Sequence, residues 1–341
     1  MSKFNKTSII NVFSELGSQL IDPNTDLSAI INDEKQYNAW FTPESVLKAI
    51  QSIGKMLNRD DLTEWLERYE LIENKPAKRI GLILAGNIPM VGFHDVLCVL
   101  VSGNNALIKS SSQDARLIKY VLQLLVNIDN SYETKFSFVE RLENFDAVIA
   151  TGSNNTSRYF EYYFGKVPYI IRKNRSSVAV LNGDETAGQL FEFGRDIFDY
   201  YGLGCRNVSK VFVPKGYRFD FFFESIESYQ PIINHHKYNN NYDYNKSIYL
   251  VNREMHFDNG FLLLKEDEKL ASPLAVLFYE YYNELETVQE QLKGQSENIQ
   301  CIVTDSSLKA NNQVVDFGKS QQPALWDYAD NADTMAFLIS L

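Results

Sequence analysis

The sequence predicts an α/β protein with a parallel sheet, a second and smaller α/β domain, and a helical N-terminal region. Three observations support this class. Short aliphatic segments alternate with segments of helical length from Lys78 to Asn174, and a similar alternation resumes at Ser176. Residues 1–75 instead carry helix signals. Apolar strands joined by crossovers of helical length are typical of a parallel sheet that is covered on both faces.

The N-terminal region, residues 1–75, is predicted to be helical. Its clearest helix start lies in "FTPESVLKAI", residues 41–50. Thr42 can cap the helix, Pro43 suits its first turn, and a glutamate follows nearby.

The first α/β segment has the order strand, helix, strand, helix, strand, helix, strand. The predicted strands are 78–86, 104–111, 145–152 and 169–174, and the predicted helices are 89–103, 113–128 and 154–165. Ligands of parallel sheets bind at the carboxyl ends of the strands. The informative residues therefore follow the strands: Gly86-Asn87, Lys109-Ser110-Ser111-Ser112 and Thr151-Gly152-Ser153.

The second α/β segment begins near Ser176, where we place the domain boundary. Its predicted strands are 176–182, 209–214, 260–267, 273–282 and 298–305, and its predicted helices are 184–201 and 286–295. The polar segment "HHKYNNNYDYNK", residues 235–246, is expected to be solvated or to face a substrate.

Composition and charge narrow the function classes. With 341 residues, 45% of them hydrophobic and 23% charged, the chain resembles an ordinary globular protein. Its net charge of −11 argues against nucleic acid or an anionic membrane as the main partner. An anionic cofactor stays compatible, because backbone amides can bind a phosphate locally. There is no signal-peptide pattern and no apolar run of ~20 residues, so we expect a cytoplasmic protein without a membrane span.

The three cysteines are expected to be reduced thiols. Cys98 and Cys301 lie in apolar segments and are predicted to be buried. Cys205 follows the turn Gly202-Leu203-Gly204 and precedes Arg206, which would favour the thiolate if it faces the sulfur. From its spacing alone, Cys205 is either a nucleophile or a structural thiol. No C-x-x-C or H-x-x-x-H spacing occurs, so no metal site is expected.

Three further features can each be explained by a functional role or by an ordinary structural role. Gly152-Ser153 could present backbone N–H groups to a phosphate, or could form an ordinary turn. Lys109 could meet a ribose or phosphate oxygen, or could be solvated. The Asn87 amide could donate a hydrogen bond to an oxyanion, or could cap a helix.

Taken in order, four of these motifs resemble the aldehyde dehydrogenase superfamily. They are "LAGNIP", "VSGNNALIKSS", "VIATGSNNTSR" and "GLGC". The C-terminal run "FGKSQQPALWDYADNADTMAFL" narrows the resemblance to the LuxC-type fatty acyl-CoA reductases of that superfamily. The resemblance covers roughly residues 78–341.

The resemblance implies a role for each motif. Cys205 aligns with the nucleophile and Asn87 with the oxyanion-binding asparagine. Lys109 aligns with the lysine that holds the adenosine ribose, and Gly152 and Ser153 with the turn at the pyrophosphate. Residues 1–175 with about 309–341 would then form the N-terminal region and the cofactor-binding domain, and residues 176–308 the catalytic domain.

Two departures from the superfamily pattern bear on the chemistry. Many NAD-preferring dehydrogenases have a glutamate at the position of Ser112; a small neutral residue there leaves room for a 2′-phosphate and favours NADPH. Hydrolytic members carry a glutamate base in the run that here reads Arg172-Lys173-Asn174-Arg175. The basic side chains of this run would hold an anionic CoA or phosphate, or form a solvated strand end.

The resemblance therefore implies NADPH-dependent reduction of an acyl-CoA, a fatty acyl-CoA in the closest branch, to the aldehyde through a covalent acyl-cysteine. CoA would be part of the substrate. One alternative is a CoA-acylating aldehyde dehydrogenase for short substrates. Another is a cysteine-dependent acyl hydrolase or acyltransferase, which would need a histidine base such as His94 or His256. The oligomeric state stays open, a homo-oligomer included.

Overall fold

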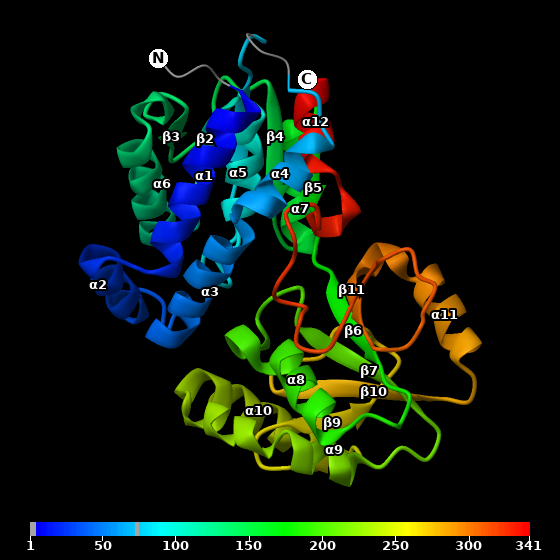
Figure 1. Cartoon of the computed structure of the whole chain (residues 1–341). Helices are drawn as coiled ribbons and strands as arrows, with labels where there is room; N and C mark the ends of the chain where they lie inside the picture. The colour runs from blue at the N-terminus through cyan, green and yellow to red at the C-terminus, as the bar shows by residue number, and fades with distance from the viewer. Residues whose placement is uncertain (1–4, 72–74) are drawn as a thin grey trace. The chain divides into compact units, whose positions relative to one another are not determined.

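The computed structural model describes residues 5–71 and 75–341, which form two compact units (Figure 1). The first unit comprises Met1–Lys173 and Pro323–Leu341, and the second comprises Asn174–Gln322. The sequence suggested a return to the first domain at about residue 309. In the structure residues 309–322 stay with the second unit, because strand β12 (Gln313–Val315) pairs with β11 (Ile299–Val303).

Four helices open the first unit: α1 (Lys6–Ile21), α2 (Thr25–Asp33), α3 (Pro43–Met56) and α4 (Arg59–Glu67). Each begins after a residue whose side-chain oxygen accepts a hydrogen bond from a backbone N–H of the first turn; these caps are Asn5, Asn24, Thr42 and Asn58. The predicted helix start at Thr42 is confirmed. Short 3₁₀ helices of this unit are Glu34–Gln36, Asn130–Tyr132 and Ala329–Asn331.

The first unit contains a five-stranded sheet in the order β3-β2-β1-β4-β5, with every neighbouring pair parallel. Its strands are β1 (Arg79–Ile83), β2 (Asn105–Lys109), β3 (Phe136–Phe138), β4 (Ala147–Thr151) and β5 (Tyr169–Arg172). The connecting helices are α5 (Phe93–Val101), α6 (Arg116–Ile128) and α7 (Asn154–Phe164). Among the strands of this sheet, only the short edge strand β3 was not predicted from the sequence. The strand order reverses between β1 and β4, which is where open parallel sheets bind their ligands.

The core of the first unit joins the sheet to segments from both ends of the chain. Trp65 of α4 and Cys98 of α5 are fully buried in one hydrophobic cluster. Met335 and Leu338 of α12 (Thr334–Ser340) belong to the same cluster, and α12 packs against α5. The last residues of the chain are therefore part of the core of this unit.

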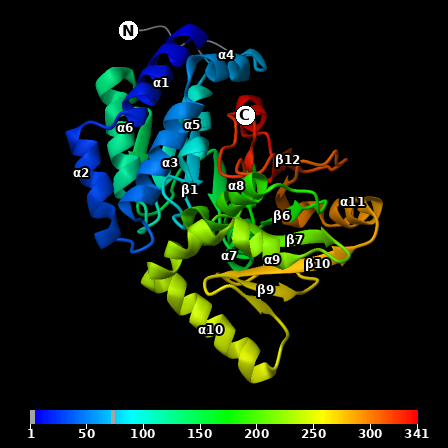
Figure 2. The same ribbon diagram turned by 60° about the horizontal axis from the view of Figure 1, so that its bottom comes forward.

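The second unit contains a seven-stranded sheet in the order β12-β11-β6-β7-β10-β9-β8, parallel except for the pair β8–β9. Its other strands are β6 (Ser176–Val180), β7 (Val208–Pro214), β8 (Phe257–Asp258), β9 (Leu263–Glu266) and β10 (Val276–Tyr282). Helices α8 (Ala187–Phe198) and α9 (Phe219–Ser225) pack on one face, and α11 (Leu285–Gly294) packs on the other (Figure 2). The 3₁₀ helices are Asp199–Gly202, Glu227–Asn234 and Ser296–Asn298.

The polar segment 235–246 differs from expectation, because it forms most of a helix, α10 (His236–Asn252). One side of this helix buries Tyr238, Tyr242 and Asn245, each at most 6% exposed. The expectation of a solvated stretch therefore holds for only one side of the helix, which exposes Asn240 and Asp243, because the buried residues recur three or four positions apart on the other side.

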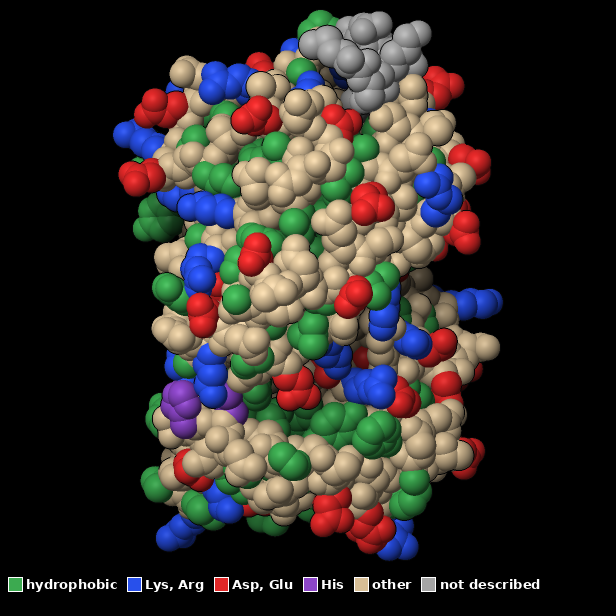
Figure 3. Space-filling model, turned by 60° about the vertical axis from the view of Figure 1, so that its left-hand side comes forward, with side chains coloured by type: hydrophobic (Ala, Val, Ile, Leu, Met, Phe, Trp, Pro, Cys, Tyr) green, Lys and Arg blue, Asp and Glu red, His purple; other side chains and the backbone are tan. Residues whose placement is uncertain are grey.

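The predicted α/β class, with its parallel sheet and helical N-terminal region, is confirmed. On the face drawn in Figure 3, acidic and basic side chains are interspersed. No helix in the described part of the chain is long and apolar enough to cross a membrane.

Candidate functional site

In the first unit, three of the predicted site segments meet at one edge of the sheet. Strand β1 lies between β2 and β4, and all three run parallel, so the segments that follow them share the carboxyl edge. These segments carry Gly86-Asn87 after β1, Lys109–Ser112 at the end of β2, and Gly152-Ser153 after β4. Asn87, Lys109, Ser112 and Ser153 are all exposed there.

The loops after β1 and β2 are fastened to each other. The Leu84 N–H donates to the Lys109 carbonyl over 3.1 Å. A Cβ on Gly86 would lie only 2.5 Å from the Ser111 hydroxyl oxygen, so the backbone at this position can approach because it carries no side chain. The two loops therefore form one surface next to Asn87.

A buried carboxylate completes this attachment. Asp114 accepts a hydrogen bond from the Met90 N–H over 2.7 Å, and Met90 has a left-handed backbone with φ 59°. Asp114 is 5% exposed, and burial raises its pKa to about 8, because the charged form loses its water. Asp114 thus holds an unusual backbone conformation three residues after Asn87.

The turn after β4 leads directly into a helix. The Ser153 hydroxyl accepts from the Thr156 N–H over 3.2 Å and caps α7. A Cβ on Gly152 would lie 2.9 Å from the Phe160 ring, so this turn also depends on glycine. The structure leaves the first N–H groups of α7 at the carboxyl edge, which is a suitable environment for a phosphate.

In the second unit, Cys205 lies on the turn between α8 and β7, before the amino end of β7. All three cysteines are free thiols; Cys205 is exposed, whereas Cys98 and Cys301 are buried, as predicted for these two. The Cys205 carbonyl accepts from the Ser177 hydroxyl of β6 over 3.0 Å.

The Arg206 side chain anchors the Cys205 turn to the segment that contains Gln313 and Ser320. Its guanidinium donates to the Ser320 carbonyl and, over 2.6 Å, to the Gln313 side chain. Asp196 of α8 holds the same segment, accepting from the Gly318 N–H over 2.6 Å and the Ser320 N–H over 2.9 Å. The first half of the C-terminal run is therefore anchored beside Cys205.

A cavity of about 140 Å³ lies behind the Cys205 turn. Its walls include Tyr201, Gly204, Asn207, Tyr238 and Pro273, all from the second unit. A cavity of ~150 Å³ in another protein holds one benzene ring. This pocket, which is lined by Gly204 and Asn207 of the turn and not by Cys205 itself, thus accommodates a single flat ring or a short aliphatic group.

The basic run Arg172-Lys173-Asn174-Arg175, which begins at the last residue of β5, differs from both expectations at its first residue. Arg172 is 6% exposed, forms an ion pair with Asp95 of α5, and donates to the Thr334 hydroxyl over 2.9 Å. The positive charge of Arg172 is neutralised by Asp95 inside the first unit. Arg172 therefore neither binds an anionic ligand nor lies in solvent, and both expectations for the run are wrong at this residue. Lys173 is exposed and pairs with Glu161 over 2.9 Å.

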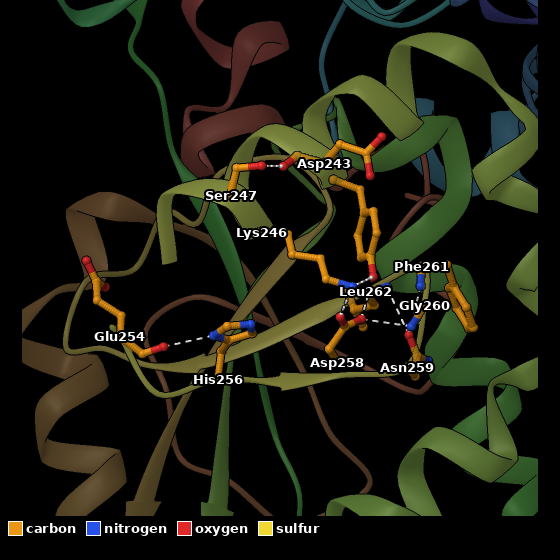
Figure 4. Close-up of polar contacts among 11 residues, drawn as sticks. Asp243, Lys246, Ser247, Glu254, His256, Asp258, Asn259, Gly260, Phe261 and Leu262 are labelled. Atoms are coloured by element: carbon orange, nitrogen blue, oxygen red, sulfur yellow. Dashed lines mark hydrogen bonds and ion pairs between the residues drawn. The ribbon is translucent and has the colours of Figure 1, made fainter. Parts of the chain in front are cut away.

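The two histidines considered as bases have structural contacts. His94 lies 2.9 Å from the Leu325 carbonyl and packs against Trp65 and Tyr328; burial lowers its pKa. His256 lies 2.8 Å from the Glu254 carbonyl (Figure 4).

The surroundings of His256 hold α10 against the segment that contains β8. Lys246 pairs with Asp258 over 2.6 Å (Figure 4).

Among the described residues, 5–71 and 75–341, no group of three His, Cys, Asp or Glu side chains could hold a metal ion.

Sequence reasoning missed several residues around Cys205. Asn207 of the turn and Asp196 of α8 are buried, and the rings of Tyr201 and His235 lie in contact, with their centres 4.3 Å apart. Only Asn207 offered a signal, since an asparagine two residues after a Gly-Cys turn is a common turn former. The contacts of Asp196 and His235 join residues far apart in the chain.

Solved structures of similar fold are aldehyde dehydrogenases. Aldehyde dehydrogenase 21 from Physcomitrella patens, in complex with succinate, matches with a TM-score of 0.70 and 10% identity, over 98% of this chain and 84% of that one. The P. syringae indole-3-acetaldehyde dehydrogenase AldA, in complex with NAD+ and IAA, matches with a TM-score of 0.66 and 11% identity, over 92% and 76%. An NAD-dependent aldehyde dehydrogenase from Sinorhizobium meliloti matches with 0.65 and 10%, over 91% and 74%. At these identities the likeness shows the fold.

The sequence comparison is more specific. No curated protein matches significantly. Residues 8–218 match the model of the family described as acyl-CoA reductase (LuxC). This range includes Asn87, Lys109, Gly152 and Cys205 and spans more than half of the chain. The resemblance stated from the motifs is thereby confirmed, and the chain belongs to the LuxC acyl-CoA reductase family.

Proposed function

We propose that this protein reduces an acyl-CoA thioester to the aldehyde with NADPH, through an acyl group bound covalently to Cys205. The acyl-CoA reductase family supports reduction of this substrate class. The covalent step is supported by the difference in solvent exposure among the three cysteine thiols. Cys205 is exposed on a turn beside a cavity, whereas Cys98 and Cys301 are fully buried. In this proposal the first unit binds the cofactor and the second unit supplies the nucleophile.

The carboxyl edge of the first sheet fits a dinucleotide. The N-terminus of α7 and the glycine turn before it suit a pyrophosphate, and they lie at the reversal point between β1 and β4. Lys109 offers a cation for the ribose or a 2′-phosphate, and Ser112 is small and neutral. When bound, the nicotinamide supplies a hydride.

The proposed reaction at Cys205 begins with the exchange of one thioester bond for another. The thiolate attacks the carbonyl carbon, a C–S bond forms, and the bond to CoA breaks, so that CoA leaves as a thiolate that takes up a proton. The acyl carbon then accepts a hydride, and the resulting oxyanion takes up a proton to give a thiohemiacetal. The thiohemiacetal hydroxyl then gives up its proton to water as the C–S bond breaks, which releases the aldehyde and restores the Cys205 thiolate.

The oxyanion formed at each stage needs hydrogen-bond donors. The family resemblance assigns this role to the Asn87 amide and the Cys205 N–H, and in other enzymes one such donor contributes ~3 kcal/mol. The run Arg172-Lys173-Asn174-Arg175 has no carboxylate to activate water, and Arg172 is occupied by Asp95. An acyl-cysteine that hydrolyses slowly suits hydride transfer.

A radiolabelled acyl-CoA tests the covalent step. Wild-type protein should retain the label after denaturation, and Cys205→Ser should lose both this thioester label and NADPH oxidation. Cys98→Ala, a change at a buried thiol of the first unit, should keep both. Labelling that persists in Cys205→Ser would refute the nucleophile.

The same preparation separates the alternatives. Acid release from acyl-CoA without added nicotinamide cofactor would show a hydrolase. NADPH oxidation with short acyl-CoAs alone would favour a CoA-acylating dehydrogenase for short substrates.

A further inference from the structure

The backbone before Cys205 has an unusual conformation. Tyr200 and Tyr201 have φ of 52° and 60°, and Gly202 follows with φ 78°. Left-handed backbone is unfavourable for residues other than glycine, because Cβ crowds the carbonyl. Two such tyrosines in succession persist only when their surroundings hold them, and strain of this kind collects at functional sites.

Asn207 is the residue that holds this turn. Its side-chain NH₂ lies within hydrogen-bond distance of the carbonyls of Asp196, Ile197 and Asp199, at 3.2, 3.4 and 2.9 Å. These carbonyls belong to the end of α8 and the residue after it, where helical partners run out. The amide therefore stabilises the point at which the chain leaves the helix.

The side-chain oxygen of Asn207 holds the turn that carries Cys205. The Asn207 side-chain oxygen accepts from the Gly204 N–H over 2.8 Å, and the Asn207 N–H donates to the Gly204 carbonyl over 3.0 Å. Asn207 is 4% exposed. Cys205 thus lies between Gly204, which is held on both its polar atoms, and Arg206, whose guanidinium is anchored on Ser320.

We propose that Asn207 is a positioning residue for the Cys205 nucleophile. This inference rests on the proposed function, since it assigns Asn207 a role in acyl transfer through Cys205. The Asn207 side chain joins the strained exit of α8 to the Gly204 peptide, so it sets the direction from which the thiol meets a carbonyl. A misplacement of about 1 Å can lower a rate by about 10²-fold.

Asn207→Asp tests the proposal. Aspartate keeps an acceptor for the Gly204 N–H but turns the donor into an oxygen that faces three carbonyls. We expect kcat for acyl-CoA reduction to fall by about 10²-fold, with the KM for NADPH within threefold of wild type. The alkylation rate of Cys205 by iodoacetamide, measured by mass spectrometry, should change at least fivefold, because the other two thiols are buried.

Asn104→Asp is the matched control. Asn104 is also 4% exposed, accepts from the Lys78 N–H over 2.9 Å, and donates to the Leu338 carbonyl over 3.4 Å, before the amino end of β2. Asn104→Asp should lower the Tm as Asn207→Asp does. Its kcat and its rate of Cys205 alkylation should both stay within threefold of the wild-type values. If Asn207→Asp does not fold, Asn207→Ser decides by the same measurements.

Two results separate this proposal from the function itself. If Asn207→Asp keeps the wild-type kcat and alkylation rate, the positioning role is refuted while Cys205 labelling still supports the function. If wild-type protein gives no Cys205-dependent label, the proposed function fails, and the alkylation rates alone report whether Asn207 positions the thiol.

Discussion

At the scale of single residues, the three thiols lie in different surroundings, which supports the different role proposed for Cys205. Cys98 lies in α5 and Cys301 in β11, and both side chains are fully buried. Burial raises the pKa of Cys98 well above that of a free thiol, because the thiolate would lose its hydration. Cys205 is exposed on a turn that Ser177 and Asn207 hold through its backbone. Exposure together with a fixed backbone is what a nucleophile requires.

Ser112 carries the expected preference between the two nicotinamide cofactors. Ser112→Glu would place a carboxylate beside the proposed ribose site, where it repels a 2′-phosphate and accepts from ribose hydroxyls. We expect the ratio of kcat/KM for NADPH to that for NADH to fall at least tenfold, or about 1.4 kcal/mol. Steady-state kinetics with both cofactors measure this ratio.

Gln113→Glu is the control for this change, because it adds the same charge at the next exposed residue. It should alter the ratio less than threefold. A wild-type preference for NADH would contradict the argument from Ser112.

At the scale of elements, the site of the first unit depends on how two loops are joined. The loop after β1 and the loop after β2 meet where Gly86 approaches Ser111, and Asp114 fastens Met90. Each loop alone is an ordinary strand-to-helix connection. Their attachment gives Asn87 a defined position on the carboxyl edge.

Asp114 predicts a pH dependence of stability. Its pKa is raised from 3.8 in the unfolded chain to about 8, so the folded state binds the proton more tightly. The stability that it contributes is therefore complete below pH 3.8 and is lost as the pH rises through 8, by at most about 1.4 kcal/mol per pH unit. Asp114→Asn stays neutral and keeps an acceptor for the Met90 N–H.

Urea denaturation between about pH 5.5 and 8.5 tests this sign. The stability of Asp114→Asn relative to wild type should increase as the pH rises. Asp60→Asn, which changes an exposed carboxylate of α4, should differ from wild type by a nearly constant amount. A relative stability of Asp114→Asn that decreases with pH would show that the carboxylate is stabilising when charged.

At the scale of the whole molecule, the first unit is assembled from the two ends of the chain. The last segment, Pro323–Leu341, returns to this unit and supplies Met335 and Leu338 to its core. Arg172, just before the chain enters the second unit, binds Asp95 and Thr334. One buried cation thus connects β5, α5 and the beginning of α12.

Arg172→Met should destabilise the protein strongly. The change leaves Asp95, which is 6% exposed, without its cation, and removing one partner of a buried ion pair costs about 3–5 kcal/mol. Lys173→Met should cost less than about 1 kcal/mol, because the Lys173 and Glu161 side chains are 54% and 43% exposed. The free energies of unfolding in urea give both values.

The double variant Arg172→Met/Asp95→Leu completes this experiment, since it replaces both charges by apolar groups. It should recover much of the loss seen in Arg172→Met. Equal effects of Arg172→Met and Lys173→Met would contradict the structural role of Arg172.

The sequence alone determined the α/β class, the positions of the longer strands and of most helices that connect them, and the order of the motifs that lead to the acyl-CoA reductase family. These follow from local patterns, since apolar periodicity and caps such as Thr42 act over a few residues. It also separated Cys205 from the two buried cysteines, because their neighbours in the chain are apolar.

Only the tertiary structure decided what the polar side chains do. Arg172 pairs with Asp95, 77 residues away, and Arg206 contacts Ser320, 114 residues away. Asn207 is buried because α8 and β7 close on it, and residues 309–322 stay in the second unit because β12 pairs there. Local sequence specifies burial and periodicity, but the partner of a buried charge or amide is chosen by the packing of distant segments.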